Sequence, residues 1–160
     1  MNEPKKVKVF AYGSNMCSQR MRKRIPSAKS LGRAKLPNKR LVCNKRSDDG
    51  SAKANLENTG ELVWGVLYEM DSAELNTLDN CEKGYERINI DVQTDAGLSE
   101  NAFVYVATET ANLTHDHRPY EWYKKYIISG ALEHKLPTSY INFLEKIESK
   151  PDLRNSVKRL

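Results

Sequence analysis

Residues 62–70 form the apolar run that most restricts how this chain can fold. Their sequence, Leu-Val-Trp-Gly-Val-Leu-Tyr-Glu-Met, is almost continuously apolar, β-branched or aromatic, which predicts a strand buried on both faces. Gly65 inside this strand predicts a bulge or a close approach of another backbone segment. We therefore expect this strand in the interior of the molecule.

Strand patterns dominate the first two thirds of the chain, and helical spacing dominates the last third. Strands are predicted at 5–11, within 28–46 as one or two pieces, at 52–56, at 62–70, at 86–94 and at 102–106, with a turn at 58–60. Helices are predicted at 17–24, from Asp71 with Glu74 as its capping-box partner, at 119–134 and from 137 to about 149. This order is typical of an α+β fold with many short non-local strands, such as a small mixed β-barrel with surrounding helices.

The size and composition of the chain favour one globular domain. Its 160 residues, with 39% hydrophobic and 29% charged residues, can bury a core, so we expect a single domain over 1–160 with a frayed tail from about 150 to 160. No apolar run approaches the roughly 18 residues that span a membrane, and no signal peptide is recognisable. Three widely spaced cysteines, Cys17, Cys43 and Cys81, predict no disulfide framework and a cytoplasmic location.

Positive charge is concentrated in the first part of the chain. Residues 1–50 hold 14 Lys and Arg against 3 Asp and Glu, whereas residues 51–160 hold 12 against 18. Such a bias fits a polyanion partner, a solvated face or a cleft that steers small anions. Aromatic residues for base stacking are scarce in the basic half, which disfavours nucleic acid as the partner.

The heptapeptide at residues 10–16, Phe-Ala-Tyr-Gly-Ser-Asn-Met, follows the first predicted strand. A strand that stops in a Gly-Ser-Asn turn leaves backbone N–H groups without ladder partners, and such groups can hold a carboxylate or an oxyanion. Gly13 is expected to adopt a conformation that a Cβ would forbid. The alternative is an ordinary polar turn after an edge strand.

This heptapeptide resembles the Tyr-Gly-Ser-Asn loop of the γ-glutamylcyclotransferase superfamily. Two later segments support the resemblance, in the family's order: residues 75–82, similar to a segment that ends in the catalytic glutamate, and residues 123–137, similar to the family's C-terminal region. The resemblance implies the family's barrel fold and a cofactor-independent cyclisation. In that reaction the α-amine of a small γ-glutamyl amide attacks the γ-carbonyl, which releases 5-oxoproline and an amine or amino acid.

The resemblance also implies roles for particular residues. Glu82 matches the catalytic acid and base, and burial would raise its pKa toward neutrality, against the charge of Lys83. Lys83 departs from the glycine that often follows the family's glutamate, and the segment before the next tyrosine is short. The substrate-binding residues implied are Tyr12, Gly13, Ser14, Asn15 and Met16 in the loop, and Tyr85, Tyr105 and Tyr123 in the pocket wall. For each tyrosine, core packing is the alternative.

Other functions find less support in the sequence. His115 and His117 flank an aspartate in a polar stretch without a third ligand, so we expect a solvated loop and no metal site. Two alternatives to a cyclotransferase remain open: a non-catalytic binding module that uses its basic half, and a hydrolase that releases glutamate. The sequence predicts a small-molecule partner but does not indicate an oligomeric state.

Overall fold

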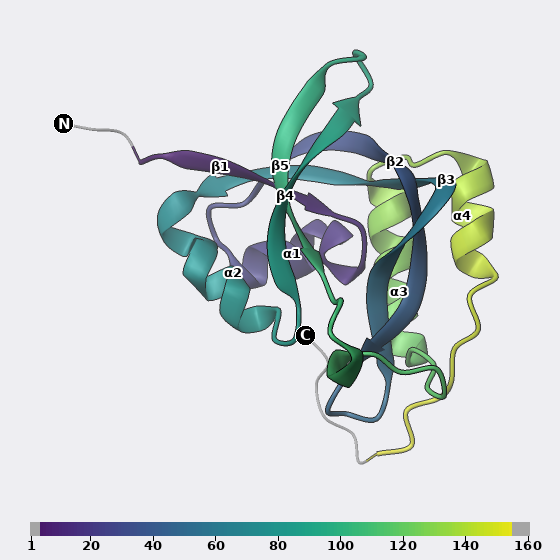
Figure 1. The fold of residues 1–160 in the computed structure, drawn as a ribbon. Helices are drawn as coiled ribbons and strands as arrows, with labels where there is room; N and C mark the ends of the chain where they lie inside the picture. The colour runs from purple at the N-terminus through teal and green to yellow at the C-terminus, as the bar shows by residue number, and fades with distance from the viewer. Residues whose placement is uncertain (1–3, 155–160) are drawn as a thin grey trace.

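A closed five-stranded β-barrel forms the centre of the computed structural model, which describes residues 4–154 (Figure 1). The strands are β1 (Lys6–Ala11), β2 (Lys29–Arg46), β3 (Ala52–Asp71), β4 (Glu86–Thr94) and β5 (Ser99–Val106). They follow the order β1-β3-β2-β4-β5 around the barrel, and every neighbouring pair is antiparallel except β1 with β5. This architecture confirms the predicted α+β class and the small mixed barrel.

The strands β2 and β3 are longer than the sequence suggested. The turn predicted at residues 58–60 is wrong, because β3 continues through it and stays paired with β2 on both sides. The register shifts there between Pro37 and Lys39, and Asn38 adopts a left-handed φ of 62°. Turn-forming residues therefore bend a continuing pair of strands at this point, which helps β2 and β3 to curve around the barrel.

The strand predicted at 62–70 lies in the core, as its apolar character indicated. Val63, Tyr68 and Met70 are completely buried. No bulge interrupts the ladder at Gly65, which pairs with Ala34. A Cβ at Gly65 would stand 2.4 Å from the carbonyl oxygen of Ala11, so glycine is required by the close approach of β1, just before the strand enters the Gly-Ser-Asn loop.

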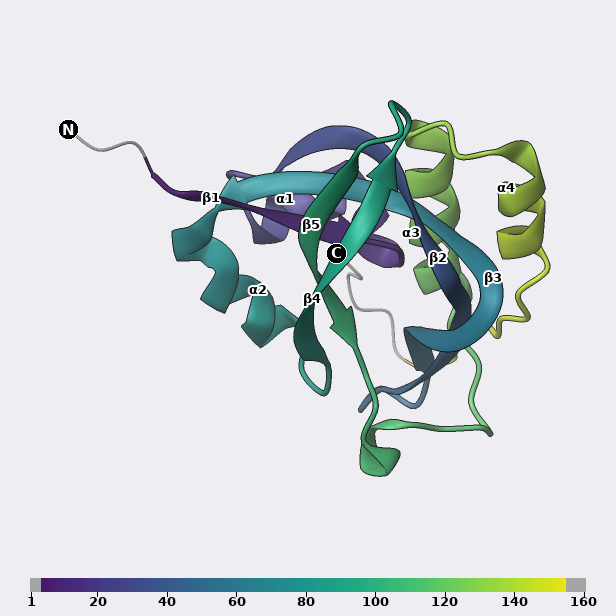
Figure 2. The ribbon, with the colours of Figure 1, turned by 45° about the horizontal axis from the view of Figure 1, so that its top comes forward.

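Helices cover the barrel from two sides. The α-helices are α1 (Ser18–Arg24), α2 (Leu75–Cys81), α3 (Glu121–Glu133) and α4 (Thr138–Glu145), and short 3-10 helices lie at η1 (Ser14–Met16), η2 (Ser72–Glu74) and η3 (Thr110–Asn112). Figure 2 shows α2 on the side opposite to α3 and α4, and α3 packs against η1. Within residues 4–154, no helix is long and apolar enough to cross a membrane.

Two predicted helix boundaries differ from the structure. The capping box is wrong: Asp71 makes no side-chain cap, and the Glu74 carboxylate accepts a hydrogen bond from the distant Ser27 N–H at 3.1 Å. The last helix, α4, ends at Glu145 rather than near 149. At both helix boundaries, residues contact other segments instead of making the local helical contacts that the sequence predicted.

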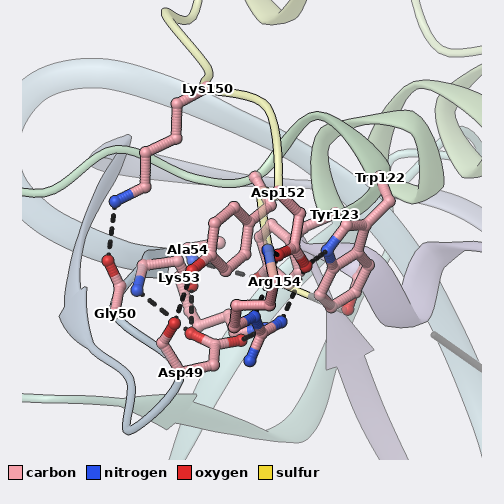
Figure 3. A network of polar contacts seen from close by, with 12 residues as sticks. Asp49, Gly50, Lys53, Ala54, Trp122, Tyr123, Lys150, Asp152 and Arg154 are labelled. Atoms are coloured by element: carbon pink, nitrogen blue, oxygen red, sulfur yellow. Dashed lines mark hydrogen bonds and ion pairs between the residues drawn. The ribbon is translucent and has the colours of Figure 1, made fainter. Parts of the chain in front are cut away.

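Several contacts join the segment 150–154 to the rest of the molecule. Lys150 forms a bridge with Tyr120, and its ammonium donates to the Gly50 carbonyl at 2.7 Å (Figure 3). The Asp152 carboxylate accepts a hydrogen bond from the Trp122 indole N–H at 2.9 Å and pairs with Arg154 at 2.7 Å. These contacts fasten the segment to the β2–β3 turn and to the start of α3. Residues 155–160 of the predicted tail lie outside the described residues.

Candidate active site

A small cavity of about 50 Å³ lies where β1 runs into η1, facing the end of α2. Eight of the site residues predicted from the sequence line it: Tyr12, Gly13, Ser14, Asn15, Glu82, Tyr85, Tyr105 and Tyr123. They come from segments separated by up to about a hundred residues of chain, so the barrel and its helices bring them together. Met16 is the predicted residue that does not line the cavity.

The Glu82 carboxylate faces the Gly-Ser-Asn loop across this cavity. Glu82 directly follows α2, whose Leu78 side chain is completely buried, and the Glu82 side chain itself is only 16% exposed. Its Oε1 accepts a hydrogen bond from the Asn15 side-chain amide at 2.8 Å, and the Arg24 guanidinium lies 4.0 Å away. The Glu82 carboxylate therefore lies within hydrogen-bonding reach of the loop and next to a cation.

Burial raises the pKa of Glu82 above its ordinary value, and this effect exceeds the opposing ones. The groups that favour the carboxylate form are the Arg24 charge, the hydrogen bond from Asn15, and then the charges of Arg20 and Lys45. A carboxyl with a raised pKa can both accept and return a proton near neutral pH. The positive charges that moderate its pKa come from α1 and β2.

The loop presents backbone donors that the fold leaves unused. Its internal hydrogen bonds run from the Met16 N–H to the Gly13 carbonyl and from the Cys17 N–H to the Ser14 carbonyl. Among residues 4–154, no hydrogen bond uses the N–H groups of Gly13, Ser14 or Asn15. Since these three residues line the cavity, their N–H groups are available to an anionic group bound there.

Met16 differs from the other predicted loop residues. It is completely buried, its carbonyl accepts a hydrogen bond from the Tyr68 hydroxyl at 3.0 Å, and its N–H is bonded within the loop. Met16 therefore anchors the loop from the interior, outside the cavity lining. Gly13 has a φ of −113° and a ψ of −138°, and a Cβ there would stand 3.0 Å from the Ala54 Cβ and crowd the cavity.

The three pocket tyrosines differ in what their hydroxyls do. Tyr85 donates to the Ala54 carbonyl at 2.6 Å, and Tyr105 donates to the Asp79 carboxylate at 2.7 Å. The Tyr123 hydroxyl instead accepts the Ala54 N–H at 3.0 Å, which leaves its own hydrogen available to donate. Burial raises the pKa of Tyr123, so the hydroxyl stays protonated. Tyr85 and Tyr105 shape the wall, whereas Tyr123 can also bind a ligand oxygen.

Two arginines of α1 belong to the site, although the sequence analysis did not single them out. Arg20 is buried, donates to the Ser14 hydroxyl at 3.1 Å and lies 4.7 Å from the Tyr126 ring centre. Arg24, one helical turn later, donates to the Asn15 side-chain oxygen at 3.4 Å. Their spacing of four places both on one helix face, and this spacing within the basic first part of the chain was the available signal.

A second, larger space adjoins the cavity, and we call it the outer cleft. Its volume is about 520 Å³, and it shares Ser14, Glu82, Tyr85 and Tyr123 with the small cavity. Its cationic lining residues are Arg20, Arg24, Lys45, Arg46, Lys53 and Lys83. A substrate can therefore place one end against Glu82 and the loop while the remainder lies in a basic cleft.

Within residues 4–154, no three His, Cys, Asp or Glu side chains are grouped in a way that could hold a metal ion. The cysteines are all unpaired thiols, and burial raises the pKa of Cys43 to about 12. Since only a thiolate is an effective nucleophile, Cys43 is a poor one near neutral pH. Glu82 remains the titratable group best placed to act on a molecule in the cavity.

Comparison with known proteins gives a consistent result. Residues 62–144 match the model of the AIG2-like family. A γ-glutamylcyclotransferase from Bos taurus is 34% identical over 149 residues, covering 87% of this chain and 77% of that protein, and the Homo sapiens protein of the same name is 32% identical with equal coverage.

Solved structures agree with these sequence matches. A structure titled γ-glutamyl cyclotransferase superimposes with a TM-score of 0.83 at 30% identity, over 96% of this chain and 93% of that one. A yeast enzyme described as specific to glutathione has a TM-score of 0.64 at 12% identity, over 87% and 93% of the two chains. At that identity the yeast structure supports the fold alone.

Proposed function

This chain belongs to the γ-glutamylcyclotransferase family, and we propose that it converts a small γ-glutamyl amide into 5-oxoproline with Glu82 as the proton shuttle. The observation that carries the proposal is the Glu82 carboxylate, mostly buried and 2.8 Å from the Asn15 amide, across a cavity from unused loop N–H groups. A non-catalytic binding module would not need a raised carboxyl pKa at this point.

The reaction requires proton transfers from the attacking nitrogen to the leaving nitrogen, and one stabilised anion. Glu82 takes a proton from the substrate α-ammonium, and the resulting amine attacks the γ-carbonyl carbon of the same molecule to form the ring C–N bond. The C–N bond to the leaving group then breaks as Glu82 returns the proton to the leaving nitrogen. The ring nitrogen gives up its extra proton to the regenerated Glu82 carboxylate, which passes it to the released amine. Because the nucleophile is tethered, effective molarities of about 10⁵–10⁸ M can contribute to the rate. This chemistry needs no cofactor.

The loop and Tyr123 supply the remaining interactions. We propose that the N–H groups of Gly13, Ser14 and Asn15 seat the substrate α-carboxylate and stabilise the tetrahedral oxyanion, and that the Tyr123 hydroxyl adds a donor. Losing one such oxyanion donor typically costs about 10²–10³ in rate. The unpaired thiols Cys17, Cys43 and Cys81 support a reducing compartment such as the cytoplasm as the place of action, and we propose that residues 1–160 act as one domain.

The product distinguishes this function from its nearest competitor. Purified protein is incubated with γ-glutamyl-alanine, γ-glutamyl-glutamate and γ-glutamyl-putrescine, and the products are separated by liquid chromatography with mass detection. Release of 5-oxoproline with a stoichiometric amount of the leaving amine supports a cyclotransferase. Release of free glutamate would establish a hydrolase, and absence of turnover on all three would contradict the proposed function.

A further inference from the structure

We infer that the outer cleft is the leaving-group site and that it selects a leaving amine carrying two negative charges, such as an acidic amino acid. This inference rests on the proposed function. The small cavity holds about 50 Å³ and the outer cleft about 520 Å³, and a volume near 300–1,000 Å³ is typical of small-molecule sites. The part of the substrate beyond the scissile bond therefore extends into the outer cleft.

The outer cleft has a strongly positive lining. Six cationic side chains line it, against the two carboxylates of Asp48 and Glu82. Of these six, Lys45 and Arg46 come from the end of β2, and Lys83 comes from the turn after α2. The cations that line the cleft therefore come from separate elements, and Lys45 lies close to Gly84, the residue after Lys83.

Two of these cations have no acidic partner within residues 4–154. The exposed side chains of Arg46 and Lys83 make no hydrogen bond or ion pair with the described residues. Lys45 lies with its Nζ 5.1 Å from the Tyr85 ring centre; burial lowers its pKa, and the charges of Asp48, Glu82 and Asp49 oppose this effect. By contrast, Lys53 is paired with Asp49 at 3.6 Å. The positive charge near the mouth of the cleft is thus available to an anionic ligand.

This arrangement discriminates among leaving groups by charge. A single carboxylate, as on alanine, can pair with one cation of the outer cleft, whereas the side-chain carboxylate of glutamate can pair with a second one. A cationic diamine such as putrescine would place its distal ammonium beside like charges, which is unfavourable. We therefore expect the order γ-glutamyl-glutamate, then γ-glutamyl-alanine, then γ-glutamyl-putrescine in kcat/KM.

The test compares these three substrates for the wild type and for a double variant, Arg46→Gln with Lys83→Gln, at low and high salt. We expect the wild type to prefer γ-glutamyl-glutamate over γ-glutamyl-alanine by roughly tenfold at low salt, and the double variant or high salt to remove most of this preference. Lys29→Gln with Lys125→Gln, two exposed cations that do not line the outer cleft, is the matched control. Equal or reversed preference in the wild type would overturn the inference, as would a preference that the double variant keeps.

Direct binding separates this inference from the proposed function. Calorimetric titration of Glu82→Gln with γ-glutamyl-glutamate and γ-glutamyl-alanine reports affinity without turnover. Tighter binding of the dianionic ligand without turnover by the wild type would retain the inference and refute the enzyme. Turnover without any charge preference would support the enzyme and refute the inference about the leaving group. Binding of an RNA oligonucleotide that the double variant abolishes would assign the outer cleft to a polyanion and overturn the inference.

Discussion

Replacing Arg24 with glutamine is expected to move the acidic limb of the pH–rate profile upward. Arg24 Nη1 lies 4.0 Å from Glu82 Oε1, and the two side chains are 27% and 16% exposed. Unit charges about 4 Å apart interact by about 1 kcal/mol in water and about 4 kcal/mol near a protein surface. At about 1.4 kcal/mol for each pH unit, these energies correspond to an upward shift of the acidic limb by about 0.7 to 3 pH units on loss of Arg24.

The sign follows from the role assigned to Glu82. The carboxylate must be unprotonated to take the α-ammonium proton, so kcat/KM falls as the pH drops through the Glu82 pKa. Since Arg24 favours the carboxylate, its removal makes this fall occur at higher pH. The assay is 5-oxoproline release measured over a pH series. Lys23→Gln, an exposed neighbour on α1, is the control, and an unchanged or lowered limb in Arg24→Gln would refute the reasoning.

Further substitutions test other parts of the molecule. Tyr123→Phe should lower kcat by about 10²-fold or more, because it removes a donor beside the loop, whereas Tyr85→Phe, whose hydroxyl serves the protein backbone, should cost less in steady-state assays. Burial lowers the Lys53 pKa from 10.5 to about 8, so between these pH values the unfolded chain binds a proton that the folded protein does not. The free energy of unfolding of the wild type should therefore rise with pH over this range. Lys53→Met should abolish this rise, measured by urea unfolding. Asp152→Ala should lower the unfolding free energy by about 1–3 kcal/mol in the same assay, because it leaves the Trp122 indole N–H without this acceptor; no change would mean that the segment 150–154 is not held in solution.

Much of the fold could be predicted because its strands have strong local patterns. The apolar residues 62–70 predicted a buried strand, and the alternating residues 86–94 and the apolar residues 102–106 predicted β4 and β5. The prediction from sequence was wrong where strand pairing overrides the local turn preference of the residues. The segment 58–60 has turn-forming residues but lies in a bend within β3, because the ladder with β2 continues on both sides. The segment 150–154 has little helix or strand periodicity, so its contacts with distant residues such as Trp122 and Gly50 could not be predicted from the sequence.

The candidate site was predictable to the extent that it resembles a known motif. The loop residues and Glu82 were named from their segments, and all of them except Met16 line one cavity in the structure. The sequence could not show that the Asn15 side chain hydrogen-bonds Glu82, or that Arg24 lies beside both. Nor could it distinguish Tyr123, with an available hydroxyl hydrogen, from Tyr85. Each of these facts depends on how distant segments pack.

The most direct test of the account is the rate of 5-oxoproline release by Glu82→Gln, compared with wild type and with Glu86→Gln. Glutamine keeps the size of Glu82 and can still contact Asn15, but it cannot accept and return a proton. Glu86 is a nearby exposed carboxylate, so its replacement controls for a general loss of negative charge. The account predicts a loss of about 10²–10⁴ for Glu82→Gln and near wild-type turnover for Glu86→Gln. Turnover unchanged in Glu82→Gln would contradict the central claim.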